Sequence, residues 1–179
     1  MTDYLAIVNK YYKEDTPLRH ILLTHSRQVA LRALAVCDAH PELSLDRDFI
    51  ESAAMLHDIG IVRCHAPGIH CFGTEPYIRH GLIGYEMLSA EGLDRHARVC
   101  ARHTGAGITL TDVQAQGLPL PEADFLPESL EEQVICFADK FYSKSHLDHE
   151  KTIAEAERSL MKFGEAGVLR FRRWVEMFG

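Results

Sequence analysis

The most informative stretch of the chain is Met55-Leu56-His57-Asp58-Ile59-Gly60. It places a histidine next to an aspartate at the end of an apolar, helix-like pattern. Single histidines and an aspartate follow Asp58 at successive intervals of 22, 23 and 36 residues, and one histidine precedes His57 by 32 residues. These intervals suit a bundle in which each successive helix brings one side chain to a common centre.

Six residues share a position on the apolar face of a predicted helix: His25, His57, Asp58, His80, His103 and Asp139. Imidazole nitrogens mixed with carboxylate oxygens are the ligands of catalytic divalent transition-metal sites. A buried carboxylate such as Asp139 is costly without a cation or hydrogen-bond donors. The set therefore predicts a metal site. The histidines beside polar or terminal positions are predicted to be exposed: His20, His40, His96, His146 and His149.

Size and composition place the chain among ordinary globular proteins. Its 179 residues fit one domain, and 46% of them are hydrophobic and 25% charged. The net charge of −7 argues against a general nucleic-acid surface. The sequence shows no secretory signal, no apolar run long enough for a membrane and no CxxC among its five cysteines. We therefore expect a cytoplasmic protein with reduced thiols and no membrane partner.

Helical periodicity dominates the chain and no alternating strand pattern is present. We predict an all-α, single-domain helical bundle of roughly seven to nine helices over residues 1–179, with a core at 18–145 and C-terminal helices at 150–178. The predicted helices are 4–13, 17–39, 46–57, 78–90, 94–103, 111–116, 128–144, 150–163 and 168–178. The C-terminal helices either close the bundle or form a dimer face, so monomer and homodimer both stay open.

Residues 61–77 interrupt this periodicity with prolines and glycines, and loops of that length are often functional. The loop contains Cys64-His65 and His70-Cys71, which could hold a structural zinc. Their adjacent pairs are unlike the usual zinc spacings, so lining of the site is the favoured interpretation.

The order of these residues resembles the HD-domain superfamily of metal-dependent phosphohydrolases. His25, His57-Asp58 and Asp139 match its pattern, and Leu56-His57-Asp58-Ile59-Gly60 is similar to the HDIG form of its signature. His80 and His103 resemble the additional histidines of a two-metal subset. The resemblance covers residues 18 to 145. One departure is Ile61-Val62-Arg63, where many HDIG sequences carry a lysine.

The resemblance implies two metal ions. His25, His57, Asp58 and Asp139 would hold one, and Asp58 would bridge to a second ion held by His80 and His103. It also implies that Asp58 orients a metal-bound hydroxide. Iron or manganese is expected, and zinc, nickel or cobalt also suit such ligands. Four cationic side chains are predicted to bind the phosphate oxygens of the substrate: Lys140, Arg27, Arg79 and Arg102.

The expected function is hydrolysis of a phosphate ester or anhydride in a small anionic substrate, most simply a nucleotide. A phosphodiesterase or dinucleoside-polyphosphate hydrolase would use both metals, whereas a mononuclear nucleotide phosphatase would need only one. Two other interpretations stay open, a di-iron oxygenase of the same superfamily and a non-catalytic metal or nucleotide sensor.

Overall fold

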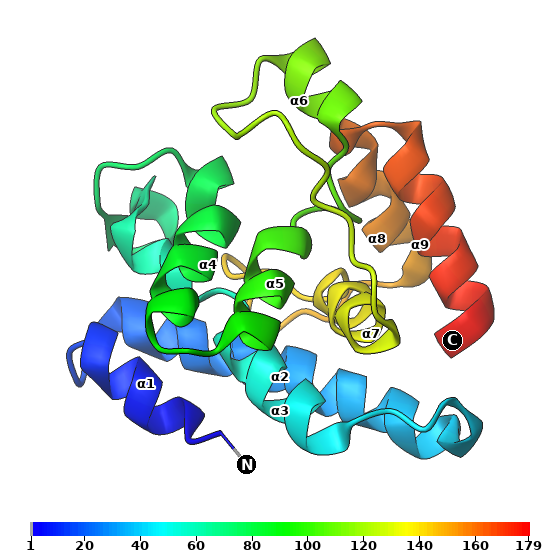
Figure 1. The fold of residues 1–179 in the computed structure, drawn as a ribbon, viewed down its shortest axis with the longest axis horizontal. Helices are drawn as coiled ribbons and strands as arrows, with labels where there is room; N and C mark the ends of the chain where they lie inside the picture. Colours follow the sequence, from blue (N-terminus) through cyan, green and yellow to red (C-terminus); the bar gives the residue numbers. More distant parts are fainter. Residues whose placement is uncertain (1) are drawn as a thin grey trace.

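The computed structural model describes residues 2–179, which are mostly helical (Figure 1). This confirms the all-α prediction. The described residues form nine α-helices: α1 (Tyr4–Tyr11), α2 (Pro17–Ala39), α3 (Arg47–Leu56), α4 (His80–Ala90), α5 (Asp94–Arg102), α6 (Leu110–Gln116), α7 (Leu130–Asp139), α8 (Ile153–Leu160) and α9 (Glu165–Phe178).

The segment predicted as a long loop is built from short elements. It contains three 3-10 helices, η2 (Ile59–Arg63), η3 (Pro67–Ile69) and η4 (Tyr77–Arg79), and a small antiparallel sheet of β1 (His65–Ala66) and β2 (Cys71–Phe72). Two further 3-10 helices are η1 (Pro41–Leu43) and η5 (Met161–Phe163). Cys64 and Cys71 are buried while His65 and His70 are exposed, so these four side chains do not converge on a zinc site.

Side-chain caps explain where several helices begin. Thr16 accepts a hydrogen bond from the Arg19 N–H, and Pro17 takes the first helical position of α2. The cap of α6 is Thr109, which shares a capping box with Asp112, so this helix begins one residue before the predicted start.

The end of α7 differs more from the prediction. The helix stops at Asp139 rather than at residue 144, and the N–H groups of residues 140–142 bond to carbonyls three residues back. Such i to i+3 bonds tighten and end a helix.

The core consists of two hydrophobic clusters that meet along α2. The first joins α2 and α3 to α7, α8 and α9, and the second joins α1, η2, α4 and α5. Helix α2 contributes Val29 to the first cluster and Leu22 to the second. His25 lies between these two residues in sequence, so the predicted ligands are placed at the junction of the two clusters.

The C-terminal helices complete the first cluster. Phe171, Trp174 and Phe178 of α9 are buried, and the Phe171 ring lies 5.7 Å from the rings of both Phe137 and Phe141. These three side chains of the C-terminal helices therefore close the bundle and are not free to form a dimer face. Whether residues 1–179 behave as one domain stays a prediction.

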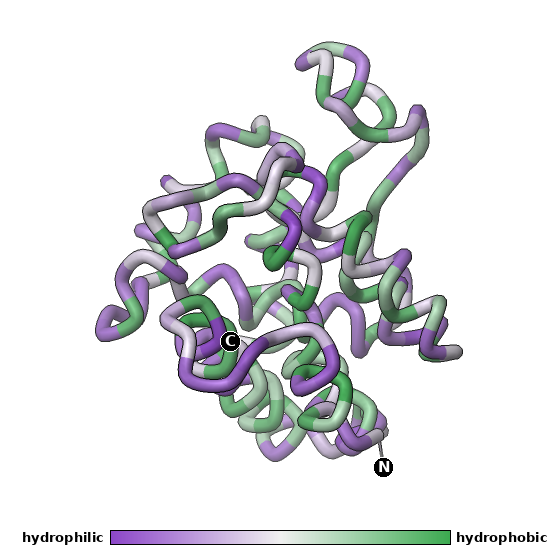
Figure 2. Tube along the Cα trace, turned by 90° about the vertical axis from the view of Figure 1, so that its left-hand side faces the viewer, coloured by the Kyte–Doolittle hydropathy of each residue, from purple (hydrophilic) through white to green (hydrophobic). Residues whose placement is uncertain are grey.

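Hydrophilic and hydrophobic residues are intermixed along the described helices (Figure 2). Within residues 2–179, no helix combines the length and the apolar character that crossing a membrane requires.

Candidate metal centre

The six predicted ligands come from five parts of the bundle and meet in its interior. His25 lies in the middle of α2, His57 and Asp58 directly follow α3, and His80 is the first residue of α4. His103 follows α5, and Asp139 ends α7. Each of the six is at most 9% exposed. The structure thus brings together every residue that the sequence predicts as a ligand.

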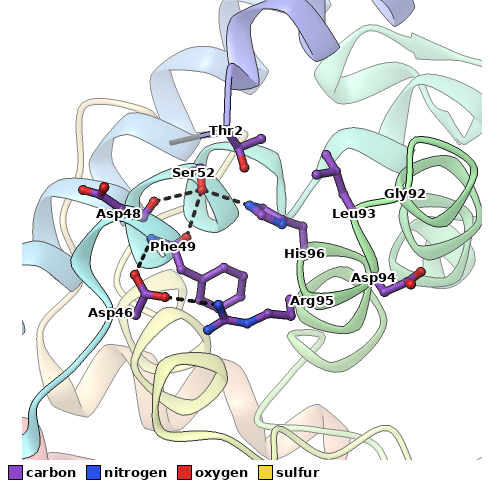
Figure 3. A pocket seen from close by; sticks show the side chains of 10 residues that line it. All are labelled: Thr2, Asp46, Asp48, Phe49, Ser52, Gly92, Leu93, Asp94, Arg95 and His96. Carbon is purple, nitrogen blue, oxygen red and sulfur yellow. Dashed lines mark hydrogen bonds and ion pairs between the residues drawn. The ribbon is translucent and has the colours of Figure 1, made fainter.

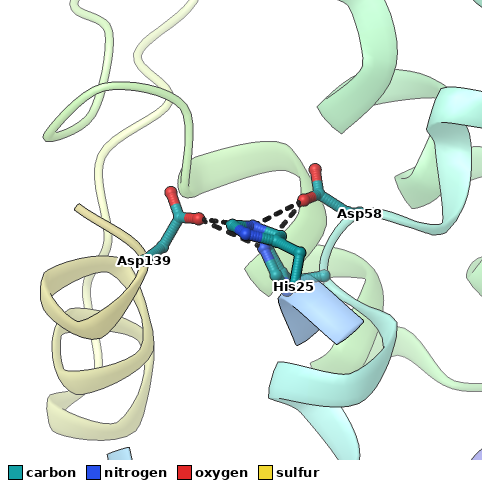
Figure 4. Close-up of side chains that lie close together, drawn as sticks. His25, Asp58 and Asp139 are labelled. Carbon is teal, nitrogen blue, oxygen red and sulfur yellow. Dashed lines mark hydrogen bonds and ion pairs between the residues drawn. The ribbon is translucent and has the colours of Figure 1, made fainter. Parts of the chain in front are cut away.

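Four of these residues form a first set. The Nε2 atom of His25 lies 3.0 Å from Oδ1 of Asp139 and 3.2 Å from Oδ2 of Asp58. His57 Nε2 approaches the same two oxygens at 3.4 Å and 3.0 Å. Figure 4 shows the His25 ring between the two carboxylates. Two nitrogens and two oxygens therefore face one small volume.

A second set lies on the other side of Asp58. His80 Nε2 is 3.5 Å and His103 Nε2 is 3.3 Å from Oδ1 of Asp58. The two Nε2 atoms are 3.0 Å apart. Each oxygen of Asp58 thus faces a different pair of histidines, which is the arrangement that a bridging carboxylate requires.

Backbone carbonyls fix the orientation of three of the rings. The Nδ1 atoms of His57, His80 and His103 lie 2.6 Å, 2.7 Å and 2.8 Å from the carbonyl oxygens of Ala54, Tyr77 and Cys100. A carbonyl only accepts, so Nδ1 must donate, and a neutral imidazole then carries a bare lone pair on Nε2. Metal-binding histidines typically donate a hydrogen bond in this way from the ring nitrogen that does not bind the metal.

The donor atoms fit divalent metal ions. Two nitrogens that each lie about 2.1 Å from one ion, at a right angle to each other, are about 3.0 Å apart. The observed 3.0 Å between His80 and His103 matches this, whereas two bare lone pairs at that distance would repel each other. Oδ1 of Asp58 and Nε2 of His57 are buried without a hydrogen-bond partner, whereas Oδ2 of Asp58 pairs with the Lys144 ammonium. Buried polar atoms of this kind call for a cation.

The electrostatics of the first set favour a positive charge. Burial lowers the pKa of His57, but the carboxylates of Asp58 and Asp139 raise it by more, to about 9. Burial raises the pKa of Asp58, but the Lys144 ammonium and His57 hold it well below the ordinary carboxyl value. Burial also raises the pKa of Asp139, but Lys140, His25 and His57 hold it well below the ordinary carboxyl value. Both carboxylates therefore stay ionised and available to a metal ion.

The second set favours neutral imidazoles instead. Burial and the neighbouring His103 lower the pKa of His80 to about 3, against the opposing effect of Asp58. Burial also lowers the pKa of His103. Neutral imidazole is the form that binds a metal ion.

The predicted substrate-binding cations take other positions. The Lys140 ammonium lies 2.6 Å from Oδ2 of Asp139 and donates to the His103 carbonyl at 2.9 Å, so it holds two ligand residues in place. Arg79 pairs with Glu75, and Arg102 with Glu128 and Glu132. Arg27 is exposed on α2. Its position two residues after His25 turns it towards a different side of the helix. Substrate binding by these four residues stays a prediction.

Sequence reasoning missed Lys144. Its ammonium lies 2.5 Å from Oδ2 of Asp58, and its side chain is only 13% exposed. Burial lowers its pKa, but Asp58, Tyr77 and Asp139 raise it by more, so the ammonium stays charged. The predicted helix over 128–144 put Lys144 on a helix terminus, whereas the chain leaves the helix at Asp139 and folds back. No local pattern signals that return.

Two adjoining cavities open beside the ligands. One of about 160 Å³ is lined by His80, His103 and Asp139, and one of about 410 Å³ extends towards η3. Lys144, Lys162, Tyr77, Tyr142 and Asp139 line both. The Tyr77 ring stacks on His80 with centroids 4.7 Å apart. A small ligand could therefore reach the metal centre from the lysine side.

A separate cavity of about 500 Å³ lies between α3 and α5, and none of its lining residues is a predicted ligand (Figure 3). His96 lines it but is only 7% exposed, so the prediction of an exposed His96 is wrong. Its Nε2 lies 2.9 Å from the Ser52 hydroxyl, and its ring packs edge-on against Phe49. Packing between two helices, invisible in the local sequence, buries this histidine.

The cysteines offer no nucleophile. All five are buried free thiols. Burial raises the pKa of Cys64 to about 12, that of Cys71 to about 11 and that of Cys136 to about 12. A thiol with such a pKa is almost wholly protonated near neutrality and reacts poorly.

Comparison with known proteins places this arrangement in a family. The HD-domain family model matches residues 22–143. An uncharacterized protein of Methanocaldococcus jannaschii is 32% identical over 148 residues, which are 76% of this chain and 80% of that protein.

Two relatives are named tRNA (cytidine(56)-2'-O)-methyltransferase. The protein from Picrophilus torridus is 31% identical over 152 residues, and the one from Thermoplasma volcanium is 30% identical over 140 residues. The matches cover 84% and 78% of this chain but only 38% and 35% of the methyltransferases. The chain thus spans little more than a third of their length.

No solved structure matches the chain. The family match covers about two thirds of the sequence, includes all six predicted ligands and agrees with the helical fold. The chain therefore belongs to the HD-domain family.

Proposed function

We propose that the chain is a metal-dependent phosphohydrolase that cleaves a phosphate ester or anhydride of a nucleotide. The observation that carries this proposal is the buried Asp58 carboxylate, whose two oxygens face two separate pairs of histidines beside a lysine-lined cavity. Two groups of buried ligands that share one aspartate are suited to a binuclear centre.

His25, His57, Asp58 and Asp139 would hold one divalent ion, and His80 and His103 would hold a second that shares Asp58. Iron or manganese suits these donors, as do zinc, nickel and cobalt. When bound, such a pair supplies Lewis acidity and a water molecule of lowered pKa for attack on phosphorus.

The protein's own residues supply the rest. Lys140 holds the Asp139 carboxylate against the His103 backbone, so the two sets keep their relative position. Lys144 stays protonated and presents a fixed positive charge next to Asp58, where it can bind phosphate oxygens. Burial of all six ligands limits the access of bulk water.

Two observations favour a small substrate over a transfer RNA, which the names of two relatives raise. The chain carries a net charge of −7, and a folded RNA needs a broad basic surface. The larger of the two adjoining cavities beside the ligands, about 410 Å³, is on the scale of small-molecule sites.

The 3.0 Å approach of His80 and His103 favours the two-metal enzyme over a mononuclear phosphatase. The test measures metal content by plasma mass spectrometry on chelator-free protein, with hydrolysis of phosphodiesters, dinucleoside polyphosphates and nucleoside monophosphates in anaerobic buffer. His80→Ala is compared with His20→Ala, whose side chain is exposed on α2.

We expect about two ions in the parent and in His20→Ala, about one in His80→Ala, and oxygen-independent hydrolysis that a chelator abolishes. Turnover that requires oxygen would point to the oxygenase. Metal binding without turnover of any phosphate compound would point to the sensor. Either result overturns the proposal.

A further inference from the structure

Most lysines of this acidic protein lie around the candidate metal centre. Four of the chain's six lysines line the two adjoining cavities: Lys140, Lys144, Lys151 and Lys162. Among the lining residues, which all belong to the described part of the chain, Asp139 alone carries a carboxylate, and Lys140 already pairs with it. Lysines without matching carboxylates around a cavity indicate an anionic ligand.

These lysines divide into two pairs. Lys140 and Lys144 contact Asp139 and Asp58 directly. Lys151 and Lys162 form no hydrogen bond or ion pair with any of the six ligand residues, yet they line the same cavity as His80 and His103. The second pair is therefore placed to bind a group next to the one that reaches the metal ions.

The surroundings of Lys151 show that this lysine lacks a carboxylate partner of its own. Burial lowers its pKa, and the ammonium groups of Lys140, Lys162 and Lys144 lower it further, against the opposing effect of Asp139. Its Nζ reaches one protein acceptor only weakly, the Lys140 carbonyl at 3.5 Å. A bound anion would relieve this repulsion and supply the missing acceptors.

The second pair also comes from a different part of the chain. Lys151 lies two residues before α8, and Lys162 lies in η5, so both follow the region matched by the family model, which ends at residue 143. The HD-domain region supplies the ligands, whereas the C-terminal segment supplies the outer wall of the cavity.

We propose that Lys151 and Lys162 form a second phosphate subsite, so that the substrate carries at least two adjacent phosphates joined by an anhydride. This rests on the proposed function for the identity of the reacting group. The first phosphate lies at the ligand sets with Lys144, and the adjoining phosphate lies between Lys151 and Lys162. Nucleoside polyphosphates and dinucleoside polyphosphates meet this requirement, and an isolated phosphodiester does not.

The decisive experiment measures binding rather than turnover. Methylenediphosphonate has the spacing of pyrophosphate but resists hydrolysis, and methylphosphonate presents one phosphonate group. Their affinities are measured by calorimetry for metal-loaded and metal-free protein. Lys151→Met and Lys162→Met are compared with Lys13→Met, which removes the same charge from an exposed side chain outside both cavities.

We expect methylenediphosphonate to bind the parent and Lys13→Met at least tenfold more tightly than methylphosphonate. Each subsite variant should lose roughly tenfold in affinity for methylenediphosphonate, with little change for methylphosphonate and unchanged metal content. Equal affinity for the two compounds, or equal losses in Lys13→Met and the subsite variants, would overturn the subsite.

Kinetics then separate the subsite from the proposed function. If the chain hydrolyses phosphate compounds, Lys162→Met should raise KM for a dinucleoside polyphosphate about tenfold relative to KM for a phosphodiester. Hydrolysis with no such change refutes the subsite alone. Tight diphosphonate binding that depends on Lys151 and Lys162, but without turnover, retains the subsite and refutes the proposed hydrolysis.

Discussion

Asp58 offers each of its carboxylate oxygens to a different pair of imidazoles, at distances of 3.0–3.5 Å. Because Asp58 belongs to both ligand sets, it should contribute more to metal binding than any single histidine does. Removing a histidine weakens one set of ligands, whereas removing the charge of Asp58 weakens both.

The first prediction concerns Asp58→Asn. An asparagine of the same shape has lost the negative charge that both ions would share, so we expect the metal content to fall from about two ions per chain to well below one. His80→Ala should lose about one. Asp148→Asn, at an exposed position, is the matched control and should retain both ions. Retention of two ions by Asp58→Asn would refute a bridging role.

The second prediction concerns the buried thiols. Because burial raises the pKa of Cys64 and Cys71 to about 12 and about 11, little thiolate exists in the folded protein at pH 8. We expect a disulfide reagent to label none of the five cysteines quickly until guanidinium unfolds the chain. Rapid labelling of even one thiol in the native protein would show that this thiol is not buried and protonated.

The same shifts make stability depend on pH. The folded-state pKa values lie above the ordinary thiol value of 9.0, so the unfolded chain loses its thiol protons first as pH rises. The contribution of these thiols to the free energy of unfolding is complete below pH 9 and declines between pH 9 and about 12.

Among the elements, the close approach of η2 to the start of α4 sets the position of His80. A Cβ atom on Gly60 would lie 2.1 Å from the His80 carbonyl oxygen and 2.5 Å from the Gly84 nitrogen. Only a glycine allows this contact. The glycine that follows the His-Asp pair therefore has a packing role, because it brings a helix carrying one ligand against the segment carrying two others.

The third prediction is that Gly60→Ala forces η2 and α4 apart. We expect a loss of about 1–3 kcal/mol in the free energy of unfolding, measured by chemical denaturation, together with loss of metal from the His80 set. Gly68→Ala is the control because a Cβ atom there would meet nothing within 4 Å. If both variants were equally stable and retained the parent's metal content, this packing role would be refuted.

At the scale of the whole molecule, α9 connects the C-terminal segment to the site. Arg170 donates to the carbonyl oxygens of Ala106 and Gly107 at 2.7 Å and 2.9 Å, just after His103. Trp174 donates to the Gln133 side chain in α7, the helix that ends in Asp139. Helix α9 therefore supports two of the segments that carry ligands.

The fourth prediction follows from these contacts. The only tryptophan, Trp174, reports on α9, whereas circular dichroism at 222 nm reports on all helices. We expect both signals to give the same denaturation midpoint because Phe171, Trp174 and Phe178 share one core cluster with α2, α3 and α7. An earlier tryptophan transition would show that the C-terminal helices unfold separately and would contradict the one-domain prediction.

Much of the fold could be predicted because its signals are local. Apolar residues at helical spacing act within a few residues of the chain, as do the side-chain caps Thr16 of α2 and Asp46 of α3, and both helices begin within one residue of their predicted starts. The six candidate ligands were also detectable, since a polar side chain on an otherwise apolar helical face is itself a local anomaly.

Other features depended on contacts between distant segments. The sequence sufficed for most of the helices and for the six inward-facing candidate ligands, because both follow from the periodicity of the backbone. Only the tertiary structure decided that Asp58 faces two histidine pairs, that Lys144 returns to the centre after α7 ends and that His96 is buried against Ser52. Only it gathered four lysines around one cavity, because the distances between side chains on different helices are set by packing and not by their spacing along the chain.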